Sequence, residues 1–137
     1  MSDAQRWNAV LGEQIRCAED MLETLARENE ALAASNHDSL ALATDAKTKL
    51  VDMLERLEAE RRTFLEPSDA AAASSRQRLH ELIARCKEQN ERNGTLLKAR
   101  AENLRVALKT LRGGEPDLYG ASGRTPARSG ARPLGTA

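Results

Sequence analysis

Aromatic residues are scarce in this chain, since Trp7, Phe64 and Tyr119 are the only three among 137 residues. A globular core normally includes aromatic side chains, because each one buries a large apolar area. Charged residues instead make up 31% of the sequence. A chain this rich in Ala, Leu, Glu and Arg is typical of long packed helices. Such helices are too slender to enclose a deep pocket.

The signatures of chemical sites are also missing. Cys17 and Cys86 form no CxxC pair, and His37 and His80 stand alone, without other ligand residues at metal-binding spacing. The sequence contains no glycine-rich phosphate loop and no grouped nucleophile and base. We therefore expect no catalytic residue, no metal site and no cofactor. Cys17 falls off the apolar pattern and is expected at the surface, whereas Cys86 falls on it and is expected in the core.

Long apolar runs are absent as well. No stretch approaches the length of a membrane span, and residues 1–11 lack the apolar core of a signal peptide. Two cysteines without a pairing pattern fit a reducing compartment. These features predict a cytoplasmic protein that does not insert into membranes.

Formal net charge is zero but unevenly distributed. Residues 1–34 carry −4 and residues 38–66 carry −2, whereas residues 67–112 carry +5 and the remainder +1. Because one half of the chain is acidic and the other is basic, this charge distribution favours a hairpin in which the chain folds back on itself. The basic segment interleaves its bases with acids and leucines, and it offers no aromatic platform for stacking bases. We therefore expect no binding of nucleic acid.

Apolar residues recur at alternating steps of three and four over most of the chain, which predicts amphipathic helices. The expected helices cover residues 3–34, 39–65 and 69–112. The expected fold is all-α, an elongated antiparallel hairpin or bundle of three long helices with coiled-coil-like packing. Six of the eight glycines and three of the four prolines follow Arg112. We therefore expect a helical domain over residues 1–112 and a flexible tail over residues 113–137.

Two boundaries separate the helices. Polar residues 35–38 favour a break with a new cap, but the steps across residues 29–43 would also allow one continuous helix with a stutter. Pro67 disfavours helix in the residue before it, and Ser68 or Asp69 can cap the helix that follows.

The recurring apolar residues of each helix form a stripe along one face, here called its seam, and polar residues interrupt these seams. Asn29, Asn90 and Asn93 occupy seam positions, where a buried asparagine fixes register at some cost in stability. Lys47 and Arg61 lie at the edge of the second seam, where we expect their charged ends to reach water.

The third helix is much longer than the second, so its last part is expected to extend past its neighbour. Leu97, Leu104, Leu108 and Leu111 would then lack partners unless the first helix covers them. An uncovered apolar stripe of this kind indicates a protein-binding surface. Ordinary bundle core remains the alternative for the same leucines.

The end of the chain carries a further pattern. It reads Asn90-x-x-Asn93-Gly94-x-Leu96-Leu97, then Ala107-Leu108-x-x-Leu111-Arg112-Gly113, then Leu118-Tyr119-Gly120-x-x-Gly123. This order of motifs resembles the C-terminal signature of the FlgN family of flagellar type III export chaperones.

The resemblance implies a function and two sites. Chaperones of this family bind the hook–filament junction proteins FlgK and FlgL, prevent their premature assembly and deliver them to the export gate, where the cytoplasmic domain of FlhA receives them. When the functional residues of the family are carried over residue by residue, the resemblance implies a client-binding site and a gate-docking site. The client-binding residues are Leu97, Leu104, Leu108 and Leu111, and the gate-docking residues are Leu118, Tyr119 and Gly120. The alternative is a structural coiled-coil adaptor without an export role. The sequence leaves open whether the free protein is a monomer or a homodimer.

Overall fold

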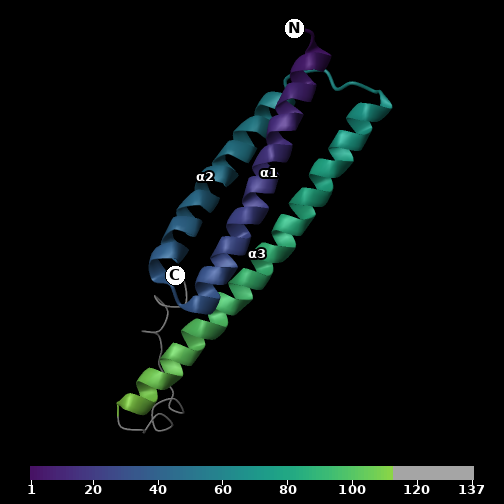
Figure 1. Cartoon of the computed structure of the whole chain (residues 1–137). Helices are drawn as coiled ribbons and strands as arrows, with labels where there is room; N and C mark the ends of the chain where they lie inside the picture. The colour runs from purple at the N-terminus through teal and green to yellow at the C-terminus, as the bar shows by residue number, and fades with distance from the viewer. Residues whose placement is uncertain (113–137) are drawn as a thin grey trace, which may run out of the picture. The chain divides into compact units, whose positions relative to one another are not determined.

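Three helices account for nearly all of the residues that the structure describes. The computed structural model describes residues 1–112, which form α1 (Asp3–Ala34), α2 (His37–Arg61) and α3 (Ala70–Leu111), with no strand in that range (Figure 1). The predicted all-α class is therefore confirmed. The chain divides into two compact units, residues 1–93 and the residues from Gly94 onward. The expected tail, residues 113–137, lies outside the described residues.

Local capping explains where α1 begins and where it stops. The Ser2 hydroxyl accepts a hydrogen bond from the Gln5 backbone at 3.1 Å, and the Gln5 side chain accepts one from the Ser2 backbone at 2.8 Å. This reciprocal pair is a capping box. At the other end Ser35 adopts a left-handed conformation with φ 55°, and the Asn36 side chain caps α2 by accepting from Ser39 at 3.0 Å. The predicted break is confirmed, and the continuous helix is wrong.

The second boundary lies earlier than expected. α2 ends at Arg61 rather than at residue 65, because the backbone amides of Thr63 and Phe64 donate to the carbonyls of Glu60 and Arg61 in a tight final turn. The Phe64 ring consequently leaves the helix and packs against the core. The expected cap is present, since the Asp69 side chain accepts from the backbone of Ala72 at 2.8 Å.

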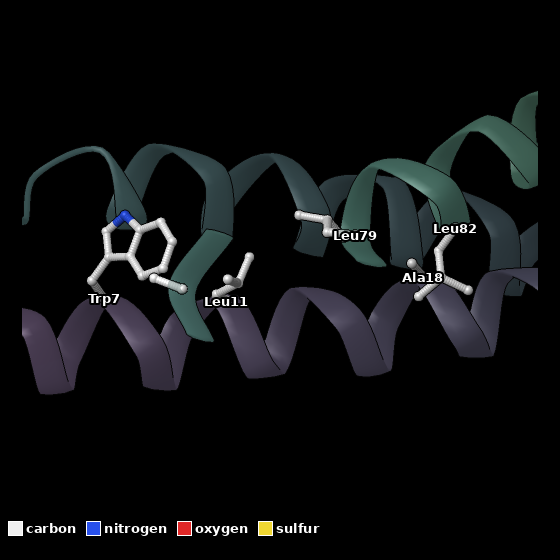
Figure 2. Packing of buried hydrophobic residues seen from close by; sticks show 6 residues of the cluster. Trp7, Leu11, Ala18, Leu79 and Leu82 are labelled. Atoms are coloured by element: carbon white, nitrogen blue, oxygen red, sulfur yellow. The ribbon is translucent and has the colours of Figure 1, made fainter. Parts of the chain in front are cut away.

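Within residues 1–93, α1 packs against both other helices (Figure 1). The α1–α2 pair is antiparallel, because Gln14 bonds to Glu58 whereas Glu28, further along α1, bonds to Lys47. Figure 2 shows the α1–α3 contact, where Trp7 and Leu11 of α1 lie near the start of α3. The buried residues of that cluster are Trp7, Leu11, Ala18, Ala72, Leu79 and Leu82.

This arrangement overturns the expectation that Cys17 is exposed. Its side chain is only 6% exposed and donates to the Met53 sulfur at 3.1 Å. A single apolar seam accounts for the face of α1 that meets α3, but Val10 and Cys17 form a second buried face against Leu57 of α2. Cys86 is buried as predicted.

Arg61 also departs from expectation. Its side chain is 13% exposed rather than extended into water, and its guanidinium donates to Glu58 at 2.6 Å. The same group lies 5.5 Å from the centre of the Trp7 ring, a cation–π distance. Arg61 therefore joins the end of α2 to the start of α1.

Candidate protein-binding site

A polar cluster ties the three helices together at the end of the first unit. Asn93 is 2% exposed, and its amide donates to the Leu25 carbonyl at 2.8 Å and to the Glu28 carboxylate at 2.9 Å. Its side-chain oxygen accepts from Asn29 at 3.2 Å and from Gln89 at 2.9 Å. A buried amide with all of these partners is stabilising, and removing one partner leaves buried polar groups unsatisfied.

Lys47 connects the same cluster to α2. Its ammonium lies 3.0 Å from the Glu28 carboxylate and donates to Asn90 at 2.7 Å. Lys47 is thus half-buried in an ion pair rather than directed into water as expected. The three predicted seam asparagines do meet in one cluster, but Asn90 is exposed at its edge, whereas Asn93 is inside it. Their role in fixing register stays a prediction.

The four predicted client-binding leucines lie on one face of the second unit. Steps of seven, four and three residues keep them within a narrow arc of an α-helix. Each is substantially exposed, by 38% for Leu97, 54% for Leu104, 38% for Leu108 and 81% for Leu111. We call these four residues the leucine face. Val106 is 48% exposed as well, but its position places it on the opposite side of the helix.

Basic residues accompany the leucine face. Each leucine is followed directly by a base, and these four are Lys98, Arg105, Lys109 and Arg112, here called the basic row. Arg105 is the member with an ion pair in the described range, donating to Glu102 at 2.6 Å. That hydrogen bond lowers the pKa of the Glu102 carboxyl.

The first unit has a hollow surface that was not predicted from the sequence. It is a groove of about 640 Å³ between α2 and α3, with apolar walls from Leu54, Leu79 and Ile83 and polar groups from Gln14 and Glu58. The groove depends on how far apart α2 and α3 lie, and no local pattern in the sequence signals that distance.

No arrangement for chemistry emerges in the part of the chain that the structure describes. Residues 1–112 contain no group of three or more His, Cys, Asp or Glu side chains able to hold a metal ion. His37 and His80 are both exposed. None of the helices in this range has both the length and the hydrophobicity to cross a membrane. Leu118, Tyr119 and Gly120, the tripeptide predicted to dock at the export gate, lie outside the described residues.

Comparison with known proteins places these features in a family. The family model described as FlgN protein matches residues 1–127, which is nearly the whole chain and includes the three helices of the described range. Separate comparisons with curated proteins and with solved structures found no match. The match agrees with the all-α fold and with the C-terminal pattern that ends in the Leu-Tyr-Gly motif. The chain therefore belongs to the FlgN family, a family of flagellar type III export chaperones.

Proposed function

We propose that this chaperone binds hook–filament junction proteins of the FlgK and FlgL type through the leucine face. In this proposal the protein works in the cytoplasm, keeps those clients from assembling early and delivers them to the cytoplasmic domain of FlhA. Docking at FlhA uses the segment of Leu118, Tyr119 and Gly120. The observation that carries the proposal is the exposure of four leucines along one side of residues 97–111.

The physical argument rests on apolar area. A helix of a soluble protein rarely leaves a continuous leucine stripe in water unless a partner covers it. An amphipathic helix that offers such a stripe can pair with an apolar helix or groove of another protein. Unassembled junction proteins have apolar segments that must be shielded before assembly, and the exposed leucines of the chaperone also need a covering partner. One contact between the two would meet both requirements.

The exposed area also sets a scale for affinity. Together the four side chains expose about as much area as two fully exposed leucines, and covering them would contribute about 3–6 kcal/mol gross at roughly 1.5–3 kcal/mol each. Losses of translational and conformational freedom oppose this gain. The leucine face by itself therefore supports a complex of moderate affinity, and additional contacts beside it would increase that affinity. Moderate affinity suits a chaperone that must release its client.

A charge placed on the leucine face tests the proposal. We expect Leu104→Glu with Leu108→Glu to abolish binding of purified FlgK-type and FlgL-type proteins, measured by titration calorimetry with the full chain. Both positions are exposed, so the helical circular dichroism of the free protein should change little.

The matched control is Ala99→Glu with Val106→Glu, which adds the same charge to exposed positions on the opposite side of the same helix. This control should retain binding. Normal client binding by the leucine variant would place the site elsewhere. Failure of the wild-type chain to bind either junction protein would favour the structural adaptor.

A further inference from the structure

The basic row gives the leucine face a charged edge on one side only. In an α-helix consecutive residues are separated by about 100° around the axis. Lys98, Arg105, Lys109 and Arg112 therefore run beside the leucines as a parallel row, one position further round. The opposite edge of the face carries Leu96, Asn103 and Ala107, with Arg100 as its single charge.

Little within the described chain neutralises this row. Residues 94–112 contain five bases and one acid, Glu102, which is already bonded to Arg105. Lys98 and Lys109 form no close ion pair with any residue in the range 1–112, although the charge of Lys109, after that of Arg105, contributes to the lowered pKa of the Glu102 carboxyl. Their ammonium groups can therefore contact a partner that lies along the leucine face.

In paired helices, charged residues that flank the apolar seam determine which partner and which orientation is accepted. We propose that the leucine face selects an amphipathic helix whose apolar seam is bordered by acidic residues. This inference rests on the proposed function and specifies the chemistry of the client segment. Carboxylates of that segment would lie against the basic row while its apolar side chains cover the leucines.

The same row argues against antiparallel self-pairing of this segment. If two copies met face to face in antiparallel orientation, two-fold symmetry would place one basic row against the other. Like charges at such flanking positions are destabilising. The one-sided charge therefore favours an acidic foreign helix over a second copy of the same segment in antiparallel orientation.

Two synthetic helical peptides test the inference directly. They share one leucine seam and differ only in the flanking positions, glutamate in one and lysine in the other. The full-length chaperone should bind the acidic peptide about tenfold or more tightly than the basic one at low salt. That preference should shrink as salt rises, because exposed charges are screened beyond about 8 Å at 0.15 M.

Charge variants locate the preference on the basic row. Lys98→Glu with Lys109→Glu should remove or reverse the preference, and Lys98→Gln with Lys109→Gln should reduce it without adding repulsion. The control Lys49→Glu with Arg85→Glu makes the same change in net charge at exposed positions of the first unit, and it should keep the preference.

The outcomes separate the two proposals. Equal binding of both peptides by the wild-type chain would overturn the inference, as would a control that loses the preference as fully as the basic-row variant. If junction proteins bind through the leucines but show no response to the basic-row variants, only this inference fails. If the chain prefers the acidic peptide but binds no junction protein, the proposed function fails while the charged edge stands.

Discussion

At the scale of single residues, Glu58 shows how a charge holds two helices in place. Its carboxylate accepts hydrogen bonds from Arg61 at 2.6 Å, from Gln14 at 2.9 Å and from Arg62 at 2.9 Å. Burial by itself raises the pKa of this carboxyl, but the three hydrogen bonds outweigh burial and hold the pKa at about 2, compared with an ordinary 4.5. The charged form is therefore the one that the folded state prefers.

This preference predicts a pH dependence for the variant Glu58→Gln. A depressed carboxyl pKa contributes stability above about 4.5 that is lost as pH falls toward 2. At neutral pH we expect the variant to lower the free energy of unfolding by about 1 kcal/mol, a value discounted because the side chain is partly exposed to solvent. The difference from wild type should shrink as the pH is lowered through this range, measured by urea denaturation.

Glu60→Gln is the comparison for that experiment, because Glu60 is an exposed carboxyl on the same helix. It should change the free energy of unfolding less at neutral pH. A Glu58→Gln effect that stays constant down to acid pH would show that the lost stability comes from packing and not from the carboxylate.

At the scale of elements, α3 combines two different environments in one helix. Its first part buries Leu79, Leu82 and Cys86 against the other helices, whereas its last part exposes leucines at the same spacing. The fully buried Asn93 and the helical Gly94 mark the division between the two units. Glycine in a helix interior costs about 1 kcal/mol relative to alanine, so the helix is intrinsically weakest near this division.

Gly94→Ala tests that weakness. A Cβ added at Gly94 would meet no atom within 4 Å, so the substitution causes no clash. We expect the free energy of unfolding to rise by up to about 1 kcal/mol through better helix propensity. Thermal unfolding followed by circular dichroism would report this gain.

Gly12→Ala provides a second helical glycine for comparison. Its Cβ would lie 3.7 Å from the Arg16 side chain, an ordinary contact, and a similar gain is expected there. Destabilisation by Gly94→Ala alone would mean that α3 requires glycine at the division for a reason other than space.

At the scale of the whole molecule, the proposed sites occupy successive parts of the chain. The proposed client-binding site lies within residues 97–111 and the proposed gate-docking site is Leu118, Tyr119 and Gly120, with Gly113 and Gly114 between them. Because the two proposed contacts use different side chains, a chaperone of this design could hold its client and dock at the gate in the same complex. The two activities should therefore be separable by substitution.

Tyr119→Ala makes that separation measurable. We expect it to leave binding of the junction proteins unchanged and to weaken binding to the cytoplasmic domain of FlhA by about tenfold or more, since a tyrosine anchor in an interface often contributes that much. The reciprocal variant, Leu104→Glu with Leu108→Glu, should keep binding to FlhA. Loss of client binding on Tyr119→Ala would merge the two sites into one.

Much of this molecule follows from local rules in the sequence. Helical periodicity, the Asn36 and Asp69 caps and the helix-disfavouring effect of Pro67 act over a few neighbouring residues, so the helices and the break between α1 and α2 could be predicted. The leucine face could be predicted for the same reason, because its spacing is a property of one helix. Its exposure was predicted as well, from the greater length of the third helix, and the exposed fractions of the four leucines agree with that prediction.

Tertiary packing decided what depends on two or three helices at once. Cys17 is buried because α1 has a second buried face toward α2, and Arg61 is partly buried because Trp7 and Glu58 converge on it. Asn93 is enclosed while Asn90 is exposed, although the sequence places both on a seam. Periodicity gives the direction of a side chain around its own helix, whereas burial depends on where the neighbouring helices lie, and that is set by the packing of all three.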